Sequence, residues 1–194
     1  MKIGVLALQG DYEAHCRVLE ACGAQFVAVR DAAALEEIEG LIIPGGESTV
    51  MSRLCDRYEL WEPLRAKIEA GMGVFGTCAG LIFMAHEISG ASQNFAQKTL
   101  DVLDIGVERN AYGAQLDSFE SDVAVPLLGD EPVRGVFIRA PRIARLGDGI
   151  EVLAKHDGVP VIVRQNRHLA MAFHPEIAGD TRLHQLWLKG LEER

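Results

Sequence analysis

Cys78 stands in a sequence setting that favours a reactive nucleophile. It is the centre of Gly76-Thr77-Cys78-Ala79-Gly80, which follows a short apolar run and opens a helical pattern. A tight turn from strand to helix needs small flanking residues, because larger side chains would collide with neighbouring elements. The turn places the thiol at the carboxyl end of the sheet, and the helix N-terminus favours the thiolate over the thiol. The segment therefore predicts nucleophilic catalysis by Cys78.

The other three cysteines carry no comparable signal. Cys16 and Cys22 fall on a predicted helix, and Cys55 falls near the end of another. No two cysteines form a C-x-x-C pair, which argues against a zinc site or a thioredoxin-like motif. A disulfide framework is not expected in a chain long enough to have a real core. We expect these three cysteines to be structural, and neither a metal nor a cofactor is predicted.

A thiolate nucleophile needs a general base, and the base needs a group that orients it. His174-Pro175-Glu176 offers both directly after the predicted strand 169–173. In an extended segment, residues two apart point to the same side, so His174 and Glu176 would face one site. The alternative is a histidine at a strand end beside an unrelated surface glutamate. The remaining histidines lack a carboxylate in such a position and are predicted to be structural or exposed: His15, His86, His156, His168 and His184.

A third motif, Pro44-Gly45-Gly46-Glu47-Ser48, follows another predicted strand. Attack on a carbonyl group places negative charge on its oxygen, and preorganised N–H groups stabilise that charge. A glycine pair lets the backbone approach closely and turn its N–H groups inward. The backbone N–H of Ala79 would be a second donor. The alternative is a plain turn before a helix, with Ser48 as the N-cap.

The first half of the chain alternates strands and helices, which implies parallel strand pairing and a three-layer α/β fold. Asp11 is the expected N-cap of the first helix, and Gly23 stands where its C-terminal cap is expected. The second helical stretch is expected to be interrupted near Asp56 and Pro63. The predicted strands are 3–8, 26–29, 41–43 and 74–75, and the predicted helices are 12–21, 49–70 and 79–87.

The second half of the chain is richer in strands. Asp157-Gly158 is a hairpin signal between two of them. Strands are predicted at 102–108, 119–125, 133–138, 150–156, 159–164 and 169–173, and a helix at 181–191 follows them. We therefore expect a mixed, mostly parallel sheet with antiparallel strands added, and a mobile polar loop at 89–99.

The length and charge of the chain limit its partners. Its 194 residues suffice for one domain, 1–194, with a well-buried core. A formal net charge of −9 argues against nucleic acid or an anionic membrane as the main partner and leaves a basic protein partner open. No apolar run reaches about 18 residues, and the N-terminal apolar run is too short for a signal peptide. We expect a cytoplasmic protein with reduced thiols.

The three motifs, in this order, resemble those of the class I, triad-type glutamine amidotransferases. The strand-to-helix turn at 76–80, called the elbow from here on, matches the pattern of that whole superfamily, and so does His174-Pro175-Glu176. Other segments are more specific and resemble one branch, the glutaminase subunits of pyridoxal 5′-phosphate synthase. They include Leu6-Ala7-Leu8-Gln9-Gly10, Arg109-Asn110-Ala111-Tyr112-Gly113, Asp117-Ser118-Phe119-Glu120 and Val136-Phe137-Ile138-Arg139-Ala140-Pro141.

The resemblance implies a flavodoxin-like three-layer sandwich and a glutaminase reaction. Cys78 would attack the side-chain amide of glutamine, and His174 would protonate the departing ammonia. A glutamyl thioester would form and then be hydrolysed, while Glu176 orients His174. Gly46 and Ala79 would supply the oxyanion N–H groups.

The same resemblance implies a glutamine pocket and a protein partner. Either of two arginines in the pocket would hold the carboxylate of glutamine. The implied pocket residues are Gly46, Glu47, Ser48, Arg109, Ile138 and Arg139. The ammonia would pass to a separate synthase subunit, a (β/α)8 barrel that builds pyridoxal 5′-phosphate, in a complex of twelve copies of each subunit. Gln9 would help to arrange the oxyanion hole when that partner docks, so the isolated chain is expected to be weakly active.

Three other functions are compatible with parts of the sequence. A glutaminase that serves a different synthase, such as the one in histidine biosynthesis, is disfavoured by the segments around Arg109 and Ile138-Arg139. A cysteine peptidase or deglycase of a related fold usually has its histidine directly after the cysteine, whereas Ala79 follows Cys78 here. A regulatory subunit without catalysis is disfavoured by the intact triad.

Overall fold

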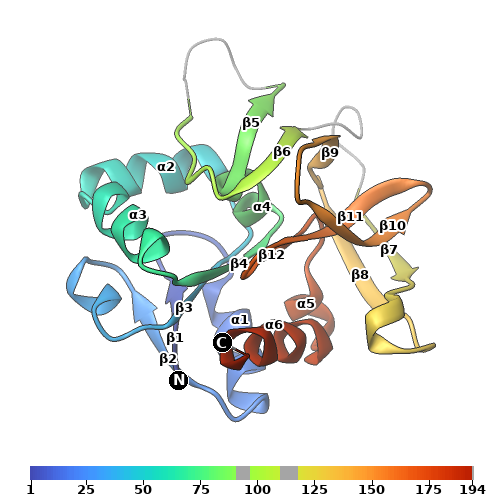
Figure 1. The fold of residues 1–194 in the computed structure, drawn as a ribbon, viewed down its shortest axis with the longest axis horizontal. Helices are drawn as coiled ribbons and strands as arrows, with labels where there is room; N and C mark the ends of the chain where they lie inside the picture. Colours follow the sequence, from blue (N-terminus) through green and yellow to red (C-terminus); the bar gives the residue numbers. More distant parts are fainter. Residues whose placement is uncertain (91–96, 110–117, 194) are drawn as a thin grey trace.

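The centre of the fold is a seven-stranded sheet in the order β10-β11-β12-β4-β3-β1-β2, seen in a computed structural model that describes residues 1–90, 97–109 and 118–193 (Figure 1). The five strands from β12 to β2 are parallel, and β11 and β10 add antiparallel at one edge. This confirms the predicted mixed, mostly parallel sheet. The bounds are β1 (Lys2–Leu6), β2 (Gln25–Val29), β3 (Gly40–Ile43), β4 (Gly73–Thr77), β10 (Glu151–His156), β11 (Val159–Gln165) and β12 (His168–Met171).

Helices cover both faces of this sheet, which gives the predicted three layers. In Figure 1, α2, α3 and α4 lie on one side of the sheet, and α1, α5 and α6 lie on the other. Their bounds are α1 (Tyr12–Ala21), α2 (Ser48–Arg57), α3 (Trp61–Glu69), α4 (Ala79–Met84), α5 (Pro175–Ala178) and α6 (Arg182–Glu192), with short 3₁₀ turns η1 (Ala33–Leu35) and η2 (Pro126–Leu128). Among the residues described, none of the helices has the length and apolarity that a membrane crossing requires.

The central strands β3 and β4 are buried along their whole length because helices pack on both of their faces. Phe75 of β4 is fully buried, and its ring lies 5.4 Å from the ring of Trp187 in α6. On the opposite face, Trp61 of α3 stacks on Phe83 of α4 with ring centroids 5.1 Å apart. Burial of one such side chain stabilises the fold by roughly 1.5–3 kcal/mol. These contacts hold β4, the strand that ends at Cys78, in a fixed position.

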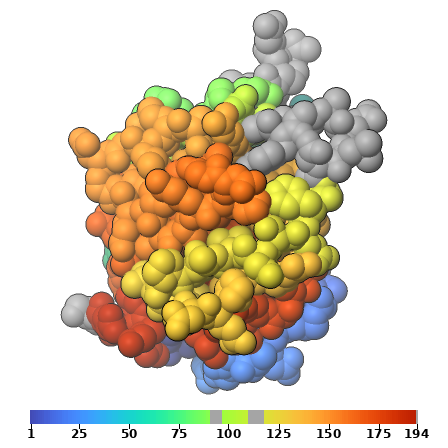
Figure 2. All heavy atoms as spheres, turned by 90° about the vertical axis from the view of Figure 1, so that its right-hand side faces the viewer, coloured from blue at the N-terminus to red at the C-terminus, as the bar shows by residue number. Residues whose placement is uncertain are grey.

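Two smaller sheets complete the second half of the chain. One has the order β5-β6-β9, and the other is the antiparallel ribbon of β7 and β8. Figure 2 views the side of the molecule that this half forms, with β7 and β8 in yellow. Phe137 of the ribbon lies 5.2 Å from the ring of Phe173, the residue before His174, so the ribbon packs beside the site. The bounds are β5 (Ala85–Ser89), β6 (Leu103–Glu108), β7 (Ser118–Val123), β8 (Val133–Ile138) and β9 (Arg142–Leu146).

Several local predictions are confirmed by backbone geometry. The side chain of Asp11 caps α1 by accepting the backbone N–H of Ala14 at 3.3 Å, and Gly23 follows α1 with φ +70°. Asp157 and Gly158 both have positive φ, as the tight hairpin between β10 and β11 requires.

Other local predictions are wrong. The helix expected at 79–87 ends at Met84, and 85–89 form β5, which pairs in parallel with β6. The apolar run of α4 ends at Ala85, and β5 then continues through the exposed residues His86 and Glu87. A strand this short and polar shows no apolar run or clear alternation that would mark it in the sequence. Pro63 lies in the first turn of α3, where its missing N–H costs nothing, so the break falls only at 58–60. Strand β9 and helix α5 were not predicted, and most of the expected mobile loop, 91–96, lies outside the described residues.

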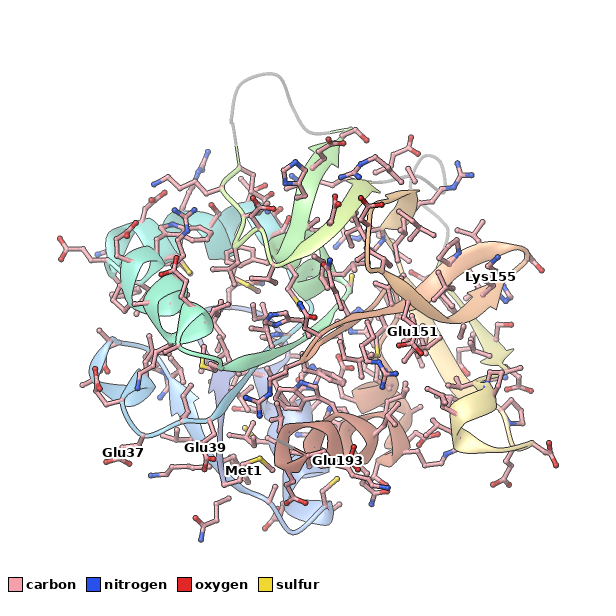
Figure 3. The ribbon with its side chains drawn as sticks, in the orientation of Figure 1. Met1, Glu37, Glu39, Glu151, Lys155 and Glu193 are labelled. Carbon is pink, nitrogen blue, oxygen red and sulfur yellow. The ribbon has the colours of Figure 1, made fainter. Side chains whose placement is uncertain are left out.

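The charged residues labelled in Figure 3 are all exposed at the surface of the molecule. Glu37 and Glu39 are exposed just before β3, and Glu39 is 3.5 Å from the N-terminal amine. Glu151 and Lys155 point outward from β10, while Leu153 and Ala154 between them are buried. Exposed ion pairs of this kind add about 0–1 kcal/mol each, so they contribute solubility more than stability.

Candidate active site

Cys78 occupies a sharp turn between β4 and α4, as predicted. Its backbone has φ 50° and ψ −100°, which is a strained conformation for a residue with a side chain. A Cβ on Gly76 would lie 2.5 Å from the sulfur of Met84, and one on Gly80 would overlap the carbonyl oxygen of Ile43. The turn therefore requires both flanking glycines. Cys78 is 8% exposed as a residue, and its sulfur lies 3.8 Å from the carbonyl oxygen of Ile138.

Sheet register brings His174 to the same edge as Cys78. The backbone N–H of Cys78 donates to Met171 at the end of β12, and His174 follows three residues later. The backbone N–H of His174 in turn donates to the carbonyl of Val136 in β8. The ends of β4 and β12, together with Val136 inside β8, thus fix the positions of the thiol and the imidazole.

His174 and Glu176 form a buried pair, with Nδ1 of the imidazole 2.7 Å from Oε1 of the carboxylate. The prediction that the two side chains face one site is confirmed, but its geometric reason is wrong. His174 is the N-cap of α5 and Glu176 lies in the first turn of that helix, so the segment is not extended. Pro175 fits the first helical position, where no N–H is needed.

The pair carries opposite charges. Burial alone would lower the pKa of His174, but hydrogen bonds to Cys78 and Glu176 outweigh it and raise the pKa to about 10. Burial alone would raise the pKa of Glu176, but His15 and His174 hold it well below its usual range. An imidazolium beside the Cys78 sulfur favours the thiolate.

The loop after β3, residues 44–48, is called the glycine loop here. It packs between the side chains of His174 and Gln9. A Cβ on Gly45 would overlap the imidazole of His174, and one on Gly46 (φ +151°) would overlap the amide oxygen of Gln9. That same oxygen accepts the backbone N–H of Glu47 at 2.8 Å. Gln9 therefore holds the Gly46–Glu47 peptide in place through its side chain.

Glu47, rather than Ser48, is the N-cap of α2. Its carboxylate accepts the backbone N–H groups of Thr49 at 3.2 Å and Val50 at 2.8 Å. Burial raises the pKa of Glu47, but these hydrogen bonds and the nearby Arg109 outweigh it, and the net pKa is lowered. The loop is thus more than a plain turn, because it presents a fixed anion beside the thiol.

A small pocket opens at Cys78 and contains every residue that the sequence assigned to glutamine binding. Its walls are Gly46, Glu47, Ser48, Cys78, Ala79, Ile82, Arg109, Ile138, Arg139 and Pro141. Ile82 and Pro141 were not predicted; the helical spacing of Ile82, four residues after Cys78, is the signal that could have found it.

The two arginines of the pocket have different surroundings. Arg109 donates to Glu47 at 3.2 Å, to Thr49 at 3.1 Å and to Gln97 at 3.1 Å, and its side chain is 18% exposed. Arg139 sits at the end of β8 with φ 44°, which turns the chain at the pocket wall. The pocket therefore holds two guanidinium groups and one carboxylate around the thiol.

The structure also places a second histidine against the triad. His15 of α1 is fully buried, with Nε2 3.4 Å from Oε1 of Glu176 and 3.1 Å from the hydroxyl of Thr77. The expectation that the other histidines lack a carboxylate is wrong for His15. His86 is exposed, as predicted, and pairs with Asp101 at 2.7 Å on the surface. A polar residue on the buried face of α1 was the available signal, because Ala14, Val18 and Leu19 share that face.

The remaining cysteines, Cys16, Cys22 and Cys55, are free thiols. Burial raises the pKa of Cys55 to about 12, and it also raises the pKa of Cys16 and Cys22. A thiol whose pKa is raised stays protonated at neutral pH, and the protonated thiol is a poor nucleophile. Within 1–90, 97–109 and 118–193, no cluster of three or more His, Cys, Asp or Glu side chains is arranged to hold a metal ion.

A family model described as the SNO glutamine amidotransferase family matches residues 5–193. The chain belongs to this family. The match spans the elbow, the glycine loop and the His174–Glu176 pair, so the whole site lies inside the family's sequence pattern.

Similar proteins and structures agree with that membership. A protein of Pelotomaculum thermopropionicum named pyridoxal 5′-phosphate synthase subunit PdxT is 52% identical over 97% of this chain and 94% of its own length. One of the same name from Mycobacterium sp. (strain KMS) is 51% identical, over 98% and 93%. A crystal structure titled glutamine amidotransferase is 46% identical, with a TM-score of 0.90 over 98% of both chains. The structure of PurLQS from Thermotoga maritima shares the fold alone, at 16% identity and a TM-score of 0.72.

Proposed function

We propose that this SNO family chain is a single glutaminase domain that hydrolyses L-glutamine to L-glutamate and ammonia. The observation that carries the proposal is the buried His174–Glu176 pair, 2.7 Å apart, at the strand edge where the elbow presents Cys78. The glycine loop and the two arginines on the pocket wall support an amino acid with a carboxylate and an amide as the substrate. The similar proteins named as synthase subunits support the same activity.

The reaction runs in two halves. The thiolate of Cys78 attacks the side-chain amide carbon of glutamine, and the resulting tetrahedral adduct loses ammonia as His174 gives its Nε2 proton to the leaving nitrogen. The C–N bond breaks and a glutamyl thioester remains. Water then attacks the thioester while His174 takes its proton, and glutamate leaves as the thiolate is restored. Glu176 keeps Nδ1 of His174 protonated throughout.

The backbone N–H groups of Gly46 and Ala79 stabilise the oxyanion of both adducts in this mechanism. Ala79 follows the nucleophile at the start of α4, and Gly46 lines the same pocket. Gln9 acts one step away, because its amide oxygen fixes the peptide that joins Gly46 to Glu47. A rotation of that peptide would change which N–H groups face the pocket, so Gln9 suits a role in partner-linked activation.

Arg109 and Arg139 are proposed to hold the α-carboxylate of glutamine. Replacing either one with glutamine is expected to raise KM by about tenfold or more, because a charge-assisted hydrogen bond contributes about 1.5–3 kcal/mol. The turnover number should fall much less, since the carboxylate is remote from the reacting amide. Steady-state kinetics of the two variants measures this, and Arg134→Gln, which removes an exposed ion-paired arginine on β8, is the matched control. A KM unchanged in both variants would remove the arginines from the substrate site.

We further propose that the ammonia passes to a (β/α)8-barrel synthase subunit that makes pyridoxal 5′-phosphate, in a cytoplasmic complex of twelve copies of each chain. The names of the similar proteins support a synthase partner. The chain's net charge of −9 suits docking on a basic protein surface.

Glutamine hydrolysis should therefore depend on the partner. We expect ammonia release by the isolated chain to be slow and to rise at least several-fold when the synthase subunit is added, with pyridoxal 5′-phosphate formed in step. A coupled assay that follows both products tests this. Equal turnover with and without the synthase would refute the dependence, and activation by the synthase of histidine biosynthesis instead would reassign the partner.

A further inference from the structure

Behind the catalytic pair lie three buried polar side chains that the mechanism above does not use. His15 of α1, Thr77 of β4 and His184 of α6 meet Glu176 of α5, and each of the four side chains is at most 4% exposed. Polar groups are expensive to bury, so a cluster drawn from four elements needs internal hydrogen bonds to persist.

The distances define a chain of contacts that ends on the carboxylate of Glu176. Nε2 of His184 lies 3.0 Å from Nδ1 of His15. Nε2 of His15 lies 3.4 Å from Oε1 of Glu176 and 3.1 Å from the Thr77 hydroxyl, which itself lies 3.5 Å from the same Oε1. Oε1 is also the atom that faces Nδ1 of His174 at 2.7 Å. One carboxylate oxygen is therefore shared by the catalytic histidine and by His15.

The donor and acceptor of each hydrogen bond follow from His184, the residue at the far end of this series of contacts. Among the described residues, Nδ1 of His184 has no hydrogen-bond partner, and a buried bare lone pair costs less than a buried N–H without an acceptor. Burial and the neighbouring His15 lower the pKa of His184 to about 3, so its ring is neutral. Its proton is then on Nε2 and is donated to Nδ1 of His15. His15 must carry its own proton on Nε2, which faces the Thr77 hydroxyl at 3.1 Å and Oε1 of Glu176 at 3.4 Å. The Thr77 hydroxyl in turn donates to the same Oε1.

The donation matters because Glu176 has little other support. Within the described part of the chain, its Oε2 is buried and has no hydrogen-bond partner. The groups that face its carboxylate are His174, His15 and Thr77, with His184 behind His15 and Asp180 near His184. Without the donor of His15, the charge of Glu176 would rest almost entirely on His174.

We propose that His15 is a positioning residue of the glutaminase site, which holds Glu176 in its charged form and aims its Oε1 at Nδ1 of His174, with His184 fixing the tautomer of His15. The proposal rests on the proposed glutaminase function. It assigns α1 a role in the reaction beyond its packing on the sheet.

The variant that tests the proposal is His15→Leu, which removes the donor and keeps an apolar side chain in the buried site. We expect the NMR titration of the His174 imidazole to move to lower pH by about half a unit or more, because a carboxylate that is no longer aimed at Nδ1 supports the imidazolium less. The basic limb of kcat/KM against pH should move in the same direction. The turnover number should fall by about tenfold, because losing a side chain that orients a functional group typically costs about 10–100-fold in activity. KM should change little.

Two further variants separate positioning from folding. His15→Gln keeps an N–H near the place of Nε2 and should restore most of the titration shift and of the turnover. His168→Leu removes another largely buried histidine, whose Nδ1 accepts the backbone N–H of Val74, and should leave the His174 titration in place. Should His15→Leu fail to fold, His184→Leu removes the donor behind His15 and is expected to give a smaller shift of the same sign.

The proposal is overturned if the His174 titration is unmoved in folded His15→Leu, or if His168→Leu moves it equally. The NMR titration uses no glutamine, so it decides the role of His15 even if the wild-type chain proves to have no glutaminase activity. Absence of glutamine hydrolysis in the wild type with its synthase would instead refute the proposed function and leave the titration result standing.

Discussion

Replacing Cys78 with alanine is expected to abolish ammonia release from glutamine, lowering turnover by about 10⁴-fold or more. The reaction begins with a bond between the Cys78 sulfur and the amide carbon, and alanine offers no atom that can form it. The strained turn and both flanking glycines remain in the variant, so the fold and the pocket should be unchanged. Ammonia release in the presence of the synthase subunit, measured beside the thermal unfolding midpoint, gives the comparison.

Cys55→Ala is the matched control for this variant. Cys55 is fully buried in α2 and burial raises the pKa of its thiol to about 12, so it has no part in nucleophilic chemistry. The control should keep its turnover while losing some stability, because truncation of a buried side chain leaves a small cavity. Full activity of Cys78→Ala would exclude the thioester mechanism altogether.

Replacing Glu176 with glutamine is expected to lower the turnover number by about 10⁴-fold, the effect of the corresponding substitution in a serine-protease triad. The amide has nearly the shape of the carboxylate, so packing is kept and the charge is lost. Because Glu176 contributes to raising the pKa of His174 to about 10, its loss should lower that pKa. The basic limb of the pH–rate profile, where His174 loses its proton, should then move to lower pH.

A rate measured across the pH range distinguishes this effect from a loss of folding. Glu151→Gln makes the same chemical change at an exposed position on β10, where Glu151 pairs with Arg164 at 2.7 Å, and should alter neither the rate nor the profile. A Glu176→Gln variant with a normal rate and an unshifted basic limb would show that His174 needs no orienting carboxylate.

Much of the fold follows from patterns that are local in the sequence. Short apolar runs such as 41–43 mark strands because a parallel sheet is buried on both faces, and Asp157-Gly158 marks a hairpin through its backbone preference. The same logic fails after Met84, where the strand 85–89 has no apolar run of its own and contains the exposed residues His86 and Glu87. Pairing with β6, which lies further along the chain, decides that outcome, and no window of local sequence contains it.

The residues of the site also differ in how far the local sequence predicts them. The elbow at Cys78 and the His174–Glu176 pair were predictable because each is a few consecutive residues whose chemistry is readable together. His15 was not, since a lone histidine on the buried face of a helix usually belongs to the core. Its partner Glu176 comes to it only through the stacking of α1 on α5. Polar contacts between residues so far apart in the sequence leave no local pattern from which they could be predicted.

The most direct test of the account is to trap the acyl-enzyme. The chain with its synthase subunit is mixed with glutamine, quenched in acid within the first turnovers, digested and examined by mass spectrometry. The account predicts a glutamyl thioester on the peptide that contains Cys78, accumulating more in Glu176→Gln if hydrolysis of the thioester becomes slower than its formation, and absent from Cys78→Ala. Sustained glutamine hydrolysis with no adduct on Cys78, or with an adduct on another residue, would contradict it.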